Sequence, residues 1–182
     1  MTPKRLVAVA LLVAAAVVPD RLVAQDDYTF TAGLLGGFGG SFDDSSDSDL
    51  DHRAVEAAIG MVTNDRTLTV VRFGQLEFDS DLSVEGLFDA ELTFLTIAGE
   101  YRFRQPSYDY GVYLGLGGYE LAGEDLFDGE VDDRGLGLAL GFTGDFDLTR
   151  RLSVIVEISA HYAFLDRADL YGMALGGLAV HF

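Results

Sequence analysis

Polar and apolar residues alternate with a period of two along most of the chain after residue 25. This period is typical of β-strands, and no segment there sustains a long helical period or an apolar run that could form a membrane helix. The alternation predicts eight strands, over Tyr28–Phe42, Ala54–Thr63, Thr67–Phe78, Leu92–Arg104, Tyr110–Leu121, Arg134–Phe146, Leu152–Phe164 and Leu170–Phe182.

The two faces of most predicted strands differ in chemistry. In the sixth strand, Leu136, Leu140 and Phe142 alternate with glycine, alanine and threonine. The polar faces carry mainly Gly, Ala, Ser and Thr with a few charges, which is typical of a narrow lumen and not of a solvated exterior. The adjacent pair Val70–Val71 interrupts the alternation of the third strand and predicts a β-bulge there.

The predicted connections alternate in length. Three are short, at Asn64–Arg66, Gln105–Asp109 and Asp147–Arg151. Three are long, at Asp43–Arg53, Asp79–Glu91 and Ala122–Asp133, and the last, Leu165–Asp169, is shorter. This order is typical of an antiparallel up-and-down barrel that crosses a membrane, with tight periplasmic turns and long outer loops.

The first 24 residues have the features of an export signal. Lys4 and Arg5 precede the apolar run Leu6–Val18, and the small residue Ala24 stands at the predicted cleavage site. The run is shorter than the roughly 20 apolar residues that a membrane helix needs. We therefore predict a signal peptide at 1–24 and a single barrel domain at 25–182.

Composition narrows the function classes. The formal charge is −18, from 30 acidic and 12 basic residues, so the surface is unsuited to nucleic-acid phosphates. The chain has no cysteine, which excludes disulfides, thiolate metal sites and cysteine nucleophiles. A soluble barrel would carry lysine along its outer face, whereas the only lysine, Lys4, precedes the predicted cleavage site.

Aromatic residues gather near the predicted strand ends, as in the interfacial girdles of membrane barrels. The expected periplasmic girdle comprises Phe30, Tyr101, Phe103, Tyr110, Phe146 and Phe182. The expected outer girdle comprises Phe42, Phe78, Phe94, Tyr162, Phe164 and Tyr171. The fold class is therefore all-β, an eight-stranded antiparallel up-and-down transmembrane β-barrel.

The last predicted strand ends in LGGLAVHF, with Gly177 and Val180 five and two residues before Phe182. This pattern resembles the terminal β-signal by which the outer-membrane assembly machinery of Gram-negative bacteria recognises its substrates, although Leu175 occupies its polar first position. Residues 25–182 resemble the small OmpA/OmpX-like outer-membrane β-barrel proteins. The resemblance implies a monomer in the outer membrane, with lipopolysaccharide and the assembly machinery as partners and without a cofactor.

A few charged side chains fall on the inward faces. They are Glu56, Arg72, Glu100, Arg102, Glu157 and His161. Charges in a low-dielectric interior persist only when they are paired, and five of these six can form Glu–Arg contacts. We therefore expect a lumen filled by this network, and a structural or surface-binding role. The alternative is a narrow pore for ions or small solutes.

A second alternative is a lipid A-modifying enzyme. Glu157, Ser159 and His161 share one strand face, and these residue types form acyl-transfer triads. Same-face neighbours on a strand are about 7 Å apart, so a direct Ser159–His161 hydrogen bond is expected to be strained. The lipid A deacylase family carries His-x-Ser facing outward, whereas this order is reversed and faces inward. We therefore predict that the protein is not an enzyme.

Most acidic residues lie in the predicted connections. The candidate cation-binding residues are Asp47, Asp49, Asp51, Asp128, Glu130 and Asp132. Their carboxylates offer oxygen ligands to divalent ions, although the glycine and closing glutamate of an EF-hand are missing. The other interpretation is a solvated, mutually repelling rim. The histidines are isolated in the sequence, so no defined metal centre is predicted.

Overall fold

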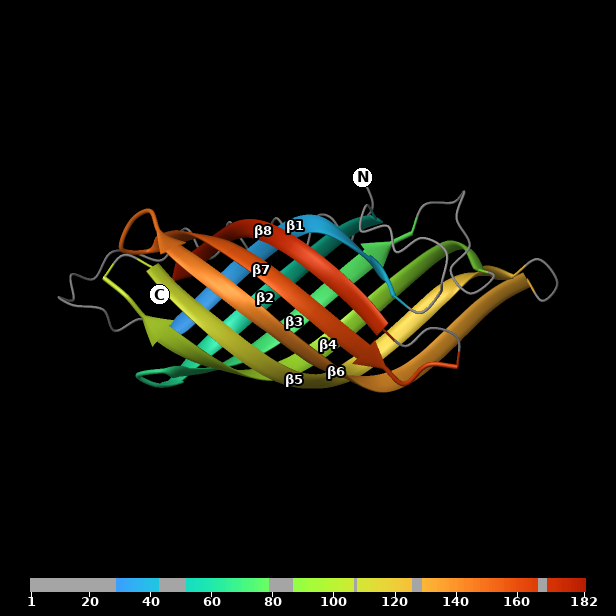
Figure 1. Ribbon diagram of the computed structural model, residues 1–182, viewed down its shortest axis with the longest axis horizontal. Coiled ribbons are helices and arrows are strands. Elements are labelled where there is room, and N and C mark those ends of the chain that lie inside the picture. Colours follow the sequence, from blue (N-terminus) through green and yellow to red (C-terminus); the bar gives the residue numbers. More distant parts are fainter. Residues whose placement is uncertain (1–28, 43–51, 79–86, 107, 126–128, 167–169) are drawn as a thin grey trace.

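The computed structural model describes residues 29–42, 52–78, 87–106, 108–125, 129–166 and 170–182, which form one closed antiparallel barrel (Figure 1). Its eight strands are β1 (Phe30–Ser41), β2 (His52–Asn64), β3 (Thr67–Glu77), β4 (Leu87–Arg104), β5 (Tyr108–Asp125), β6 (Gly129–Asp147), β7 (Leu152–Ala163) and β8 (Leu170–His181). Each strand pairs with the next in sequence, and β1 pairs with β8 from Thr31 and His181 to Ser41 and Tyr171. The predicted all-β, eight-stranded antiparallel topology is confirmed. Among the described residues, none belongs to a helix of the length and apolarity that crossing a membrane requires.

The barrel has two ends of different character. The end where β2 meets β3, β4 meets β5 and β6 meets β7 also holds the start of β1 and the C-terminal residue Phe182; we call it the turn end. The opposite end, where β1, β3, β5 and β7 finish, is called the loop end. In Figure 1 the turn end lies at the left, beside the label C.

Three strands, β4, β5 and β6, are longer than the sequence predicts by five residues or more. β5 and β6 stay paired from Tyr108 and Phe146 as far as Asp125 and Gly129, so most of the predicted connection Ala122–Asp133 is strand. β4 likewise begins at Leu87, within the predicted connection Asp79–Glu91. The prediction assigns the acidic residues of these segments to loops, whereas Glu124, Glu130 and Asp132 are exposed positions on the strands. Figure 1 shows β5 and β6 reaching beyond the other strands at the loop end.

The expected bulge at Val70–Val71 is wrong. β3 pairs continuously there with β4, and Val70 is buried while Val71 is 44% exposed. Irregularities occur instead between Val62 and Asn64 of β2 and between Phe88 and Glu91 of β4. Asp89, within the second irregularity, has a φ of 48°, a left-handed conformation that aspartate tolerates better than most residues.

The outward-facing side chains are predominantly apolar and the buried interior holds the charges. We define the outer band by the outward-facing positions of Phe30–Phe38, Val55–Met61, Thr67–Gln75, Thr93–Phe103, Tyr110–Gly118, Leu136–Phe146, Val154–Tyr162 and Ala174–Val180. None of these outward-facing residues is Asp, Glu, Lys or Arg. Leu136 is 74% exposed, whereas Arg72 is 1% exposed. The barrel is therefore arranged inversely to a globular protein with an apolar core and a charged surface.

The aromatic residues at the turn end lie on the outside as predicted. All six are exposed, Tyr108 joins them, and Phe30 stacks on Phe182 with ring centroids 6.1 Å apart. At the loop end only three of the six expected residues, Phe42, Tyr162 and Phe164, are exposed. Phe78, Phe94 and Tyr171 are buried inside the barrel, so their assignment to the outer girdle is wrong. The physical reason is that each of them falls in the alternation at a position that faces the interior, in phase with buried residues next to it in the pattern.

The interior contains two layers along the barrel. The charged layer, toward the turn end, comprises Glu56, Arg72, Glu100, Arg102, Asp145 and Glu157. The apolar layer, toward the loop end, comprises Leu76, Phe78, Leu92, Phe94, Leu121, Tyr171 and Met173. Every member of both layers is at most 5% exposed. Five of the six members of the charged layer are among the inward charges expected from the sequence, whereas the apolar layer was not expected.

Glycines make room for the largest interior side chains. A Cβ at Gly141 would lie 2.5 Å from the ring of Tyr113, and one at Gly74 would clash with the ring of Phe94. In an eight-stranded barrel the interior is only just wide enough to be filled by side chains. An aromatic ring on one strand therefore needs a small residue opposite it.

We expect Gly141→Ala to lower the stability of the folded barrel by about 1–3 kcal/mol, because overpacking displaces Tyr113. Gly99→Ala is the matched control, since a Cβ at Gly99 meets nothing within 4 Å. Urea unfolding in detergent micelles measures both variants. Equal unfolding midpoints for the two variants would contradict this account of the packing.

Candidate functional site

The charged layer is organised around Arg72 of β3. Its Nη1 donates to Oε1 of Glu56 at 2.7 Å and also to Glu157, while its Nη2 donates to Glu100 at 3.3 Å. The three carboxylates come from β2, β7 and β4, so one guanidinium links strands around much of the barrel. Such multiple charge-assisted bonds suit arginine, whose planar fork presents five donors.

Arg102 extends the network toward the turn end. Its Nε donates to Oε1 of Glu100 at 2.8 Å, and its Nη1 donates to Oδ2 of Asp145 at 3.1 Å. Glu100 thus joins the two arginines, and Thr143 also donates to it at 3.1 Å. Asp145 is not among the inward charges expected from the sequence, although it shares the inward face of β6 with Thr143.

Tyr113 of β5 is the second participant that sequence reasoning missed. Its hydroxyl donates to Oε1 of Glu157 at 2.6 Å, and the Cζ atom of Arg72 lies 4.0 Å from its ring centroid. The fifth strand is apolar or glycine on both faces, so the sequence did not show which face turns inward. The ring covers Arg72 and replaces part of its lost hydration by a cation–π contact.

The charged layer holds more carboxylates than guanidinium groups: Glu56, Glu100, Glu157 and Asp145 against two arginines. Three atoms of the layer, Oε2 of Glu56, Nε of Arg72 and Oδ1 of Asp145, have no hydrogen-bond partner among the described residues. A buried polar atom without a partner costs free energy of folding. The layer therefore combines strong ion pairs with hydrogen-bonding groups that no described residue satisfies.

His161 is buried, but its ring bonds outside this ion-pair network. The hydroxyl of Tyr119 lies 2.9 Å from Nδ1, Oγ of Ser159 lies 3.2 Å from Nε2, and the ring packs on Phe94 with centroids 4.6 Å apart. The expectation that strand spacing would strain a Ser159–His161 hydrogen bond is wrong, because the long imidazole side chain bridges the gap. The Nδ1 atom faces a tyrosine and not a carboxylate, so the pair lacks the third group of a triad.

Comparison with known proteins agrees with this architecture. No protein-family model and no curated protein sequence matches the chain. Neisserial surface protein A has a TM-score of 0.66 and 14% identity, over 85% of this chain and 97% of that chain. A major outer membrane protein of Thermus thermophilus has a TM-score of 0.63 and 13% identity, over 86% and 100%. The N-terminal β-barrel domain of Pseudomonas aeruginosa OprF has a TM-score of 0.62 and 12% identity, over 85% and 98%.

The chain has the fold of the small outer-membrane β-barrels. At these identities the likeness concerns the fold alone, so the activity must be argued from the side chains. The three barrels are matched over nearly their whole lengths, which extends the likeness to the complete barrel.

The candidate cation-binding residues of this outer-membrane barrel fold are only partly described. Asp47, Asp49, Asp51 and Asp128 lie outside the described residues, as does the predicted signal peptide at 1–24. Glu130 and Asp132 are exposed on β6. Asp132 pairs with Arg134 at 2.6 Å, and Arg134 also reaches Glu120 at 3.2 Å. A cation at Asp132 would therefore compete with an arginine of the same chain.

The candidate assembly residues lie on β8 and at the C-terminal residue that follows it. A Cβ at Gly177 would clash with the carbonyl oxygen of Leu34, so this glycine permits the close approach of β8 to β1. The outward-facing Val180 is partly exposed, and Phe182 is 42% exposed. The backbone of Phe182 exchanges hydrogen bonds with Phe30 at 2.8 and 2.9 Å. These residues thus close the barrel at the turn end.

We expect Arg72→Met to lower the stability of the barrel by about 3–5 kcal/mol, because removing one partner leaves buried carboxylates without their cation. Arg134→Met is the matched control: Arg134 also pairs with two carboxylates, but its side chain is 66% exposed, and its loss should change stability little. Urea unfolding of both variants in detergent micelles measures the difference. A similar small change in both would show that burial does not strengthen the Arg72 network.

Proposed function

We propose that the protein is an integral outer-membrane barrel with a lumen closed by side chains, and that it serves in envelope integrity or presents a binding surface outside the cell. The observation that carries the proposal is the outer band, whose outward-facing residues include no charge. An apolar belt of this extent is costly in water and favourable in hydrocarbon.

The strand lengths and the aromatic residues support this placement. A tilted membrane strand needs about 9–11 residues, and the shortest strand, β3, has 11. Exposed aromatic side chains border the band at both ends, where their amphipathic rings suit the lipid headgroup region. By this proposal the turn end faces the periplasm and the acidic loop end faces the exterior.

The two interior layers favour a closed lumen over the alternative of a narrow pore. An ion entering from the loop end would meet the apolar layer before it reached the charged one, and its hydration would be lost without compensation. The excess of carboxylates in the charged layer would favour cations if a path existed. A pore therefore requires displacement of both layers, which makes it the second candidate.

The proposed surface-binding role is assigned to the exposed acidic residues at the loop end. The extended ribbon of β5 and β6 carries Glu120, Glu124, Glu130 and Asp132 in the described region, with Arg134 among them. Lipopolysaccharide phosphates are cross-bridged by divalent ions, and exposed carboxylates are able to share such ions. The Ser159–His161 pair is buried inside the barrel, away from the lipid-facing surface, which disfavours the alternative of a lipid A-modifying enzyme.

We expect the folded protein to produce no discrete conductance steps in a planar lipid bilayer. Arg102→Ala should also be silent, because the apolar layer still fills the lumen at the loop end. Folding is checked beforehand by heat-modifiable gel mobility. Reproducible steps from the folded, unmodified protein would replace the closed barrel by the pore, and steps from Arg102→Ala alone would show that the apolar layer is not a barrier.

We expect Phe182→Ala to reduce the amount of folded protein in the outer membrane of a Gram-negative host, because Phe182 directly follows β8 in the terminal segment that the assembly machinery is proposed to recognise. Phe142→Ala is the matched control, since Phe142 is an exposed aromatic of the outer band away from the terminal strand. Heat-modifiable protein in the outer-membrane fraction is the measurement. Equal amounts of the two variants would remove the terminal-signal interpretation.

A further inference from the structure

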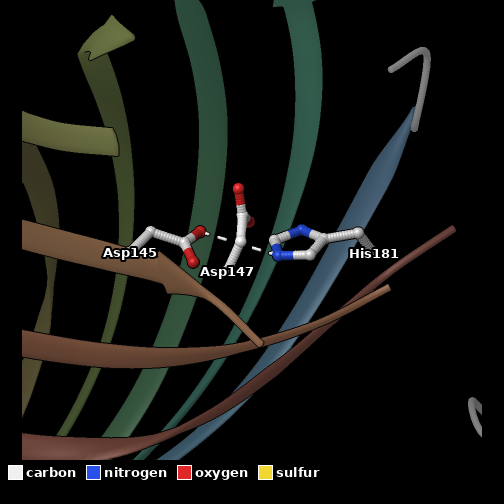
Figure 2. Close-up of side chains that lie close together, drawn as sticks. All are labelled: Asp145, Asp147 and His181. Atoms are coloured by element: carbon white, nitrogen blue, oxygen red, sulfur yellow. Dashed lines mark ion pairs between the residues drawn. The ribbon is translucent and has the colours of Figure 1, made fainter. Parts of the chain in front are cut away.

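A mixed group of carboxylates and an imidazole lies at the turn end of the barrel. Asp145 and Asp147 come from the last residues of β6, and His181 is the last residue of β8. One potential ligand atom from each of the three residues lies within 4.8 Å of the other two. Figure 2 shows the carboxylate of Asp145 pointing toward the His181 ring. Sequence spacing does not indicate this group, because His181 is far from the two aspartates along the chain.

Asp145 supplies an independent reason to expect a ligand. It is 5% exposed, and its Oδ2 atom accepts from Arg102 and lies 3.7 Å from Nε2 of His181. Its Oδ1 atom has no hydrogen-bond partner among the described residues. A buried carboxylate oxygen is normally bonded, so this one has capacity for a cation or a donor.

The negative charges around the group are not fully balanced, which favours binding of a divalent ion. Arg102 is shared between Glu100 and Asp145, so its single positive charge does not balance both carboxylates. Asp147 is exposed and adds another negative charge within ligand distance. Oγ of Ser153, on β7, lies 2.9 Å from Nε2 of His181, and this hydroxyl can reorient if that nitrogen binds a metal.

From this geometry we propose that Asp145, Asp147 and His181 form a transition-metal site, with Zn²⁺ as the ion of matching chemistry. One imidazole nitrogen and two carboxylate oxygens are a ligand set for Zn²⁺, whereas Ca²⁺ and Mg²⁺ prefer oxygen ligands alone. Tetrahedral zinc places its ligand atoms about 3.4 Å apart, so separations of up to 4.8 Å must contract by up to about 1.4 Å. The exposed side chain of Asp147 is free to make that movement, and the fourth position remains open to water.

The site would join β6 to β8 across β7. Since β8 is the strand that pairs with β1 to close the barrel, a bound ion would hold the closing strand at its C-terminal end. Binding to the folded state alone raises stability by mass action. Zinc should therefore raise the unfolding temperature of the barrel.

Calorimetric titration of the purified, micelle-folded protein, without a polyhistidine tag, with Zn²⁺ tests the proposal. We expect one ion per chain, and binding at least about tenfold weaker in Asp147→Asn and His181→Ala. Asp147→Asn is the decisive variant, because its exposed side chain has the smallest structural role of the three. Zinc should raise the unfolding temperature of the unmodified protein but not that of Asp147→Asn.

Two controls make the result specific. Asp65→Asn changes an exposed aspartate in another turn at the same end, and His52→Ala removes a histidine at the loop end; both should bind Zn²⁺ as the unmodified protein does. Unchanged zinc binding in Asp147→Asn and His181→Ala, equal loss in the controls, or displacement of Zn²⁺ by equimolar Ca²⁺ would each overturn the proposal.

Discussion

Closure of the backbone ladder between β1 and β8 is the constraint on which the other features depend. An open sheet of this length would leave a row of unpaired N–H and C=O groups on each edge strand, which water satisfies and hydrocarbon does not. Pairing from Thr31 to Ser41 removes both edges. The seam is tight: a Cβ at Gly37 or Gly177 would clash with the backbone of the opposite strand. Glycines at these two positions are therefore part of the closure itself.

Once the sheet is closed, each side chain on a strand faces either the interior or the outside. The interior is narrow, so only side chains of suitable size, or charges with partners, fit there. The interior accepts Arg72 because carboxylates from three strands and the ring of Tyr113 replace its hydration. It accepts that ring because Gly141 faces it. The apolar layer obeys the same rule, with Gly74 opposite Phe94. Large and small residues thus alternate between facing strands, and charge is admitted only with partners.

The two ends of the barrel carry different arrangements of charged side chains. At the loop end the β5–β6 ribbon carries exposed carboxylates, among them Glu124 and Glu130, into solvent, where water and salt screen their charges. At the turn end Asp145, Asp147 and His181 are drawn together by the strand ends, with two of the three buried. A dispersed acidic surface and a compact mixed group have different consequences: the first is suited to loose and the second to specific cation binding.

The sequence by itself determined the strand number and most of the inward charges, because a period of two places alternate residues on opposite sides of a sheet. It left the inward face of β5 open, since that strand is apolar or glycine on both faces. It did not determine where β4, β5 and β6 end, since acidic residues are compatible with both loops and solvent-exposed strands. Nor did it reveal the roles of Asp145 and Tyr113, the apolar layer, or the approach of His181 to β6. Alternation states which side a residue faces but not which residues of other strands it meets. Those contacts depend on strand register and barrel width, and only the closed tertiary structure specifies them.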